Sequence, residues 1–416
     1  MLDLLCETEQ LPQNVSPMSP NAVTYVPGLY MPAGEVAASA AGGGSAHQPQ
    51  TNRLNHPLRQ TPILSHSVPR PEQSIPERLN RTTTAPGPVR RSREICREIA
   101  KKRAGSFYRA ICLTPVNRRA DMFALYAWSR LADDIADESP DAKTALTALD
   151  RFSKATHEAF NNCPAGDDTS IWPAVTWTVR SCSFRERWCE DLIEGMRREI
   201  GQPDSSGDFA VSSLAQFDDY CYRVAGTVGL MCISVWGLRK GIPFDQAIPA
   251  AKARGRALQT INVLRDFAPD FDRTPRRIYF PADLLGKCGL IAEGLRQWRD
   301  PVRCEAAVRE LAAHARRNLA ESEPLADMID PSCFAVLDGL TRVYSALLDR
   351  IEKKPKLIIA ARPVHLSVPR KAWIAATAYT KGLTRRFGAS AHAKKNEIVT
   401  AAAKAKSSLK SKAEEE

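Results

Sequence analysis

Apolar residues recur at helical spacing over most of the chain between residues 92 and 383. In the stretch 118–138, Met122, Leu125 and Trp128 follow one another at intervals of three, which places them on one side of a helix. The same pattern predicts helices over Arg93–Arg103, Arg118–Glu138, Ala142–Asn161, Trp172–Ile200, Phe217–Leu238, Ala247–Phe267, Pro301–Leu319, Ser332–Lys353 and Arg370–Leu383. Strand patterns are nearly absent, and Arg277–Phe280 is at most a short extended segment. We therefore expect a single all-α domain whose site lies between facing helices of a bundle.

The two ends of the chain lack this periodicity. Residues 1–90 hold 13 of the 29 prolines, together with a Gly/Ser-rich run, and few periodic apolar positions. Such a composition buries too little apolar surface to offset chain entropy, so residues 1–91 are predicted to be a disordered Pro/Ser/Gly-rich leader. Residues 384–416 hold eight Lys/Arg and four Glu, which predicts a basic tail, disordered or loosely helical.

Composition gives no indication of a zinc protein, a secreted protein or a membrane-spanning protein. The chain has 416 residues, a formal net charge of +11, and 11 cysteines without a CxxC pair, so no zinc or redox motif is present. Residues 1–10 are acidic and do not resemble a secretory signal. The longest apolar run, Val224–Leu238, contains three glycines and is too short to span a membrane. We expect a cytoplasmic protein with reduced thiols, and peripheral membrane contact stays open.

Two acidic clusters lie within these apolar helices. They comprise Asp133, Asp134 and Asp137, and then Asn262, Asp266 and Asp270. Residues four apart share one helix face, and carboxylates on a buried face need a cation between them. Mg²⁺ takes carboxylate oxygens and commonly keeps substrate phosphates as further ligands. The first cluster alone fits a solvated helix face equally well, but the two clusters together predict a site for Mg²⁺ (or Mn²⁺) and a diphosphate.

Five motifs in order resemble the squalene/phytoene synthase family. They are Ser106–Tyr108; Ala124–Ala127 with Arg130 and Asp133–Asp137; Tyr220–Gly229; Leu258–Asp266; and Arg277–Pro281. The resemblance covers residues 92–383. It implies the class I isoprenoid (terpenoid) synthase fold, a helical bundle with a central cavity, and the head-to-head joining of two prenyl diphosphates.

The resemblance also implies roles for individual residues. The metal ligands would be Asp133, Asp134, Asp137, Asn262, Asp266 and Asp270. The diphosphate would be held by Arg130, Arg265, Arg277 and Tyr279. Phe107, Tyr220 and Gln259 would line the channel. Asp133, Asp137, Asp266, Asp270 and Tyr220 would serve catalysis directly.

Two departures from the family pattern occur after the second cluster. Pro269 stands where the family usually has Glu, and residues 271–276 form a segment about two residues longer than usual, without its Gly. Proline removes a backbone donor and ends or kinks a helix. We therefore expect the helix with Asn262 and Asp266 to break near Pro269, while Asp270 still faces the first cluster.

The substrate and product follow from the resemblance only as a class. Farnesyl diphosphate would give presqualene diphosphate or squalene, and geranylgeranyl diphosphate would give phytoene. Trp236, at the end of the apolar helix, slightly favours the shorter substrate. NADPH enters only if the product is squalene, and a monomer or weak oligomer is expected.

Two other functions remain open from the sequence. One is a different class I terpene synthase or prenyl transferase. The other is a basic helical protein that binds lipid or nucleic acid without catalysis. Lys and Arg are dispersed and not interleaved with aromatic residues, which argues against nucleic acid.

Overall fold

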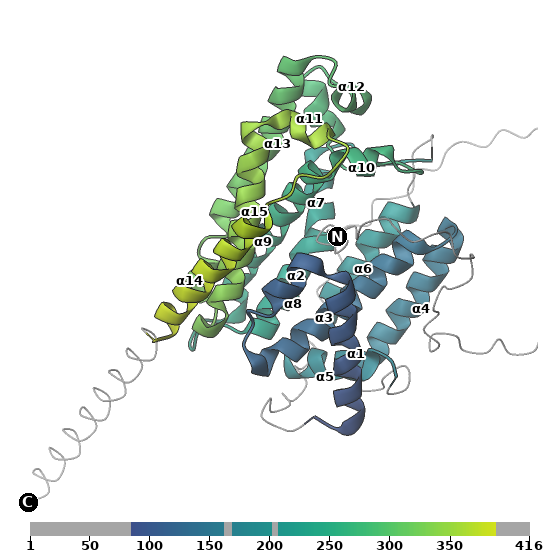
Figure 1. Ribbon diagram of the computed structural model, residues 1–416. Coiled ribbons are helices and arrows are strands. Elements are labelled where there is room, and N and C mark those ends of the chain that lie inside the picture. The colour runs from purple at the N-terminus through teal and green to yellow at the C-terminus, as the bar shows by residue number, and fades with distance from the viewer. Residues whose placement is uncertain (1–84, 162–168, 202–206, 388–416) are drawn as a thin grey trace, which may run out of the picture. The chain divides into compact units, whose positions relative to one another are not determined.

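Helices make up nearly all the regular structure of the computed structural model, which describes residues 85–161, 169–201 and 207–387 (Figure 1). The α-helices are α1 (Gly87–Arg103), α2 (Gly105–Ile111), α3 (Val116–Glu138), α4 (Ala142–Phe160), α5 (Trp172–Ser181), α6 (Glu186–Gly201), α7 (Leu214–Cys221), α8 (Thr227–Trp236), α9 (Phe244–Arg265), α10 (Phe267–Asp272), α11 (Ala282–Lys287), α12 (Ala292–Arg296), α13 (Pro301–Glu321), α14 (Leu325–Met328) and α15 (Phe334–Lys353). Residues 368–387 are also helical. The predicted all-α fold is confirmed.

Short irregular elements connect these helices. A π-helical turn, η2 (Tyr222–Gly226), joins α7 to α8, and the 3₁₀ turns η3 (Pro331–Cys333) and η4 (Pro355–Ile359) flank α15. The strands β1 (Phe209–Ala210) and β2 (Arg277–Ile278) pair in parallel, with Phe209 opposite Arg277. The extended segment predicted at Arg277 is therefore a strand of two residues, and its pairing fixes the backbone of Arg277.

Three boundaries differ from the sequence-based expectation. The helix expected over Trp172–Ile200 is two helices, because the chain turns after α5 and Ser183 adopts a positive φ of 54°. Helix α1 begins at Gly87 and not near Ser92. Pro88 is compatible with this start, because backbone N–H groups in the first turn of a helix have no partner within the helix and proline lacks only that group. The last helix continues to residue 387, four residues beyond the predicted domain end. The rest of the predicted leader and tail, residues 1–84 and 388–416, lies outside the described residues.

The buried side chains form two apolar clusters that share α9. Helices α1, α3, α4, α5, α6 and α8 build the first cluster, to which α9 contributes Ala247 and Ala251. The second is built on α7, α11, α13 and α15, and α9 contributes Ile261 and Leu264 to it. Helix α9 therefore runs from one cluster into the other, and its last turn carries the second acidic motif.

Glycines allow α9 to pack at close range against η2 and α8. A Cβ on Gly255 would lie 2.4 Å from the carbonyl oxygen of Ala225, and a Cβ on Gly229 would lie 2.8 Å from that of Ala251. At these positions any larger residue would clash with the backbone of the neighbouring segment. The contacts also show that the two segments run antiparallel, because residue 225 lies beside 255 and residue 229 beside 251.

Every described cysteine is a free thiol, as expected. Burial raises the pKa of Cys96 to about 12, so this thiol is unreactive at neutral pH. No helix among the described residues is long and apolar enough to cross a membrane.

Candidate active site

A cavity of about 730 Å³, counting its open mouth, lies between α8, α9 and α15. Its walls are mainly apolar. They comprise Phe107, Ala225, Val228, Gly229, Cys232, Trp236, Ala251, Arg254, Gly255, Leu258, Gln259, Asn262, Leu325, Leu337, Leu340, Thr341 and Tyr344. Phe107 and Gln259, which were predicted to line the substrate channel, both lie on this wall, and Trp236 lies there too. Asn262 belongs both to this wall and to the second acidic motif, so the cavity reaches that motif.

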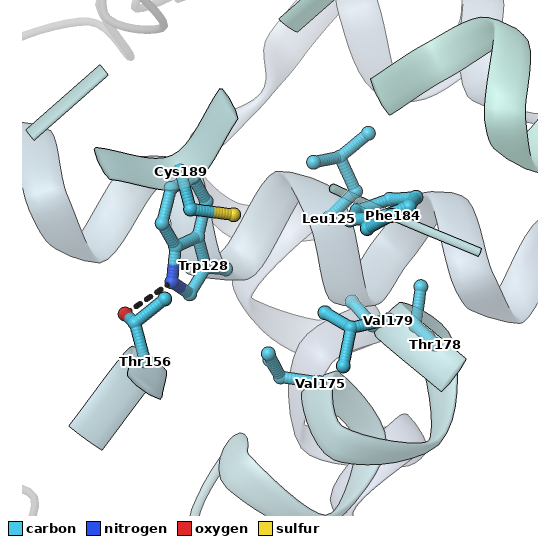
Figure 2. Close-up of a pocket in the computed structure, with 9 residues that line it drawn as sticks. Leu125, Trp128, Thr156, Val175, Thr178, Val179, Phe184 and Cys189 are labelled. Atoms are coloured by element: carbon cyan, nitrogen blue, oxygen red, sulfur yellow. Dashed lines mark hydrogen bonds between the residues drawn. The ribbon is translucent and has the colours of Figure 1, made fainter. Parts of the chain in front are cut away.

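A second, smaller cavity lies inside the first apolar cluster, between α3, α5 and α6 (Figure 2). Its free space is about 260 Å³ when the gaps between the surrounding atoms and its open side are counted, and its walls include Leu125, Val175, Val179 and Phe184. The indole N–H of Trp128 donates to Thr156 Oγ1 at 3.0 Å, so this pair is satisfied internally. Nothing on its wall is suited to holding a charged group, and we regard it as a packing void.

The first acidic cluster lies in the last turns of α3 and faces two directions. Asp134 pairs with Arg130 in its own helix and with Arg103 of α1 at 3.1 Å. Asp137 instead pairs with Arg277 of β2 at 2.7 Å and with Arg273 at 3.5 Å. Asp133 is buried, with 5% of its surface exposed. Asp134 was predicted to bind metal and Arg130 to bind diphosphate. In the structure they form an ion pair with each other, on the side of α3 that faces α1 and away from Arg277.

The second cluster spans a helix break. Helix α9 ends at Arg265, Asp266 has φ −106° and ψ 13°, and α10 begins at Phe267. Pro269 lies in the first turn of α10, where its missing N–H removes no helical hydrogen bond. The predicted helix break near Pro269 is confirmed. It occurs at Asp266, three residues before the proline. The Asp270 amide still donates to the Asp266 carbonyl at 3.0 Å, which keeps the two aspartates on neighbouring turns.

Arg265 contacts its neighbour in sequence, Asp266, and does not point away from it. Its Nε lies 3.0 Å from both carboxylate oxygens, and Nη2 donates to Oδ2 at 2.8 Å. Both side chains are buried. Burial nevertheless raises the pKa of Asp266, because the single arginine only partly offsets the loss of water.

The pKa of Asp270 is also raised, and it is raised close to neutrality. Burial, followed by the nearby charges of Asp266 and Glu199, raises its pKa to about 7, against the opposing effect of Arg277. The Asp270 carboxylate therefore lies among these groups and not in open solvent. Arg277, one of the charges that act on Asp270, also pairs with Asp137 of the first cluster. That Asp270 faces the first cluster directly stays a prediction.

Arg277 links Asp137 of the first cluster to Glu199, a residue that the motif analysis missed. Its Nε donates to Glu199 Oε1 at 2.8 Å and its Nη1 to Asp137 Oδ1 at 2.7 Å. Glu199 lies on α6 with only 11% of its side chain exposed. One signal could have found it: residue 199 continues the apolar stripe of Leu192 and Met196, where an acidic residue needs a partner.

Aromatic rings line the side of Arg277. Tyr220 and Tyr279 stack with centroids 4.9 Å apart, and Phe209 lies 5.7 Å from Tyr279. Tyr220 therefore belongs to this aromatic group and not to the wall of the main cavity, where the sequence had placed it. Burial, then Tyr279 and Glu199, raise the pKa of Tyr220 well above its usual value, so its hydroxyl stays protonated.

The donor atoms of the two clusters fit a hard divalent cation. They are oxygens throughout, and Asn262 Oδ1 is buried without a hydrogen-bond partner. Asp266 and Asp270 repel each other, which a shared cation would relieve. Within the part of the chain that the structure describes, no three His, Cys, Asp or Glu side chains already form a metal-binding group. Arginines pair with several of these carboxylates instead.

Comparison with known proteins identifies relatives over most of the helical region. The family model "Squalene/phytoene synthase" matches residues 100–370. Phytoene synthase 2 from Solanum lycopersicum is 29% identical over 296 residues, covering 70% of this chain and 89% of that protein. Phytoene synthase 3 from Zea mays is 30% identical over 328 residues, covering 77% and 72%.

Solved structures share the fold at lower identity. A dehydrosqualene synthase crystallised with a ligand superposes with a TM-score of 0.61 at 22% identity, covering 70% of this chain and 96% of that one. A squalene synthase from Alicyclobacillus acidocaldarius superposes with a TM-score of 0.57 at 22% identity, covering 65% and 97%. With the family model matched across most of the helical region, the chain belongs to the squalene/phytoene synthase family.

Proposed function

We propose that this protein joins two prenyl diphosphates head to head, with Mg²⁺ or Mn²⁺ bound at the two acidic clusters. One observation carries the proposal: Asn262 belongs both to the wall of a large apolar cavity and to the acidic motif. A site of this kind suits a molecule with a charged head and a long hydrocarbon tail. Family membership supplies the reaction class.

The bound cation would be held by Asp133 and Asp137 on α3 and by Asn262, Asp266 and Asp270 across the α9–α10 break. It would supply Lewis-acid stabilisation of the departing diphosphate. The residues of the chain add positive charge at the same end. Arg277 and Arg265 present planar guanidinium groups, whose geometry matches phosphate oxygens.

The arginines are at present engaged with the aspartates. Arg277 and Arg273 pair with Asp137, and Arg265 pairs with Asp266. Once a cation neutralises these carboxylates, the guanidinium groups become available to phosphate oxygens. The ion pairs therefore hold the arginines near the place where negative charge arrives, which limits reorganisation during the reaction.

The cavity would protect reactive carbocations from water. Its apolar walls exclude solvent from the isoprenoid chains, and the ring of Phe107 can stabilise positive charge through its π face. Tyr220 stays protonated at neutral pH, so we assign it hydrogen-bond donation and not base catalysis.

Product analysis tests the proposal. The full-length protein is incubated with farnesyl or geranylgeranyl diphosphate, with Mg²⁺ or with EDTA, and with or without NADPH. Products are identified by mass spectrometry, and diphosphate release is measured. We expect a product with twice the carbon number of the substrate, formed only with the metal. A cyclised product of unchanged carbon number would indicate another class I terpene synthase, and no consumption would refute the proposal.

We also propose peripheral contact with an anionic membrane through residues 368–387. Ile374 and Ala378 face the protein, whereas Trp373 and Phe387 are exposed. Arg370, Lys371, Lys381 and Arg386 give the same helix positive charge. Aromatic and basic residues on one helix suit the interface of an anionic bilayer. Co-sedimentation with vesicles containing anionic lipid should fall for Trp373→Ala, and equal sedimentation with neutral vesicles would contradict the charge argument.

A further inference from the structure

The wall of the main cavity contains one fixed cation. Arg254 lines the cavity together with Gly229, Leu258, Leu337 and other apolar residues, and only 8% of its surface is exposed. Burying a charged group in such surroundings costs free energy unless the group is paired or hydrogen-bonded. No described carboxylate forms an ion pair with it. Burial lowers its pKa to about 10, against Glu323 and Asp338, so it remains charged at neutral pH.

Hydrogen bonds to two other helical segments hold this guanidinium in place. Its Nε donates to Ser322 Oγ at 2.7 Å, and its Nη2 to the Ser322 carbonyl oxygen at 3.2 Å. Its Nη1 donates to Thr341 Oγ1 on α15. Ser322 caps the C-terminus of α13, where positive charge is favoured. The side chain therefore cannot swing aside without losing all three contacts.

Arg254 lies partway along the cavity. It precedes Asn262 by eight residues on α9, which corresponds to ~12 Å along the helix axis. The antiparallel pairing of Gly229 with Ala251 places Trp236, further along α8, beyond Arg254 as seen from Asn262. A prenyl chain with its diphosphate at the acidic clusters thus meets Arg254 before it reaches Trp236.

We propose that Arg254 is a specificity-determining residue that limits the length of the prenyl tail and favours fifteen-carbon over twenty-carbon substrates. This inference rests on the function proposed above. A hydrocarbon tail that passes Arg254 would displace the remaining water around the guanidinium. The tail cannot form hydrogen bonds in place of that water, so the charge would lose solvation. The three hydrogen bonds prevent the guanidinium from yielding to a longer tail.

The test compares kcat/KM for farnesyl and geranylgeranyl diphosphate in the full-length protein. Wild type should prefer the shorter substrate. Arg254→Leu should raise the ratio of longer to shorter substrate by at least about 10-fold. Arg254→Lys keeps the charge and should shift the ratio less. Arg256→Leu is the matched control, because Arg256 lies on the same helix but bonds Asn318 of α13 at 3.1 Å, outside the cavity wall.

A binding series on the wild type makes the inference independent of how the variants fold. Unreactive thiodiphosphate analogues with ten, fifteen and twenty carbons are titrated in the presence of Mg²⁺. Affinity should rise from ten to fifteen carbons and then stop rising or fall. A continued rise to twenty carbons, a wild-type preference for the longer substrate, or an unchanged ratio in a folded Arg254→Leu would overturn it. Wild type that consumes neither diphosphate would instead refute the proposed function.

Discussion

The two acidic clusters share a spacing of carboxylates but differ in how the protein neutralises them. In the first, burial alone would raise the pKa of Asp137, yet Arg277 and Arg273 outweigh it and lower the pKa. In the second, burial, Asp266 and Glu199 together raise the pKa of Asp270 to about 7. The first cluster is thus largely neutralised by arginines, whereas the second retains repulsion between its own members. A bound cation would therefore stabilise the second cluster more than the first. The second cluster is also the one in which the helix ends.

Removal of one carboxylate from each cluster should have the largest effect. We predict that Asp133→Ala and Asp266→Ala each reduce turnover on the order of 10³-fold, because both clusters act on one diphosphate. Diphosphate release under saturating Mg²⁺ measures this. Asp150→Ala is the control, since Asp150 is an exposed residue of α4 that pairs with Arg197. Near-normal activity in only one of the two variants would show that the clusters serve different sites.

Loss of the arginine that links Asp137 to Glu199 should have the next largest effect. Arg277→Met leaves Asp137 and Glu199 without their shared cation, so we predict a roughly 100-fold loss of activity and a loss of about 3 kcal/mol in unfolding free energy. Thermal or urea unfolding and initial rates measure the two effects. Arg296→Met removes a pairing with Asp272 at 2.6 Å on the surface and should cost far less. Equal losses in both variants would argue against a special role for Arg277.

The hydroxyl of Tyr220 should matter less than the charged groups. Because the phenol stays protonated, Tyr220→Phe keeps the stacking on Tyr279 and removes only one hydrogen bond, so we predict roughly a 10-fold decrease in kcat. Tyr220→Leu removes the ring as well and should decrease kcat further. If Tyr220→Phe abolished turnover, the hydroxyl would have to act in proton transfer.

The smallest effect is expected at Pro269. Pro269→Glu adds a third carboxylate to the cluster that already repels itself, so activity in saturating Mg²⁺ should be unchanged or raised, while activity at limiting Mg²⁺ should increase. Titration of initial rate against Mg²⁺ measures this. A higher Mg²⁺ requirement in Pro269→Glu would contradict the view that the second cluster is the one in need of positive charge.

Much of the fold followed from the sequence because apolar periodicity is a local property. The helices α3, α4, α9 and α13 lie within a few residues of their predicted bounds. The break after α5 was missed because the apolar pattern continues through Cys182 and Phe184 while the backbone turns at Ser183.

The site was predicted less completely, because partners distant in sequence decide it. Spacing placed Asp133, Asp137 and Asp266 on helix faces but did not indicate that Arg277 joins Asp137 to Glu199. Arg254 was not recognised either, since its neighbours Ser322 and Thr341 come from later helices. The separation of Asp134 from Asp137 likewise depends on α1, which carries Arg103.

Binding of an unreactive substrate analogue tests the central claim, that both clusters hold one diphosphate through a shared metal. The affinity for farnesyl thiodiphosphate is measured by calorimetry with and without Mg²⁺ in wild type, Asp137→Asn, Asp270→Asn and the double variant. We predict Mg²⁺-dependent binding in wild type, a large loss in each single variant, and no further loss in the double variant. Additive losses, or full affinity without Mg²⁺, would contradict the account.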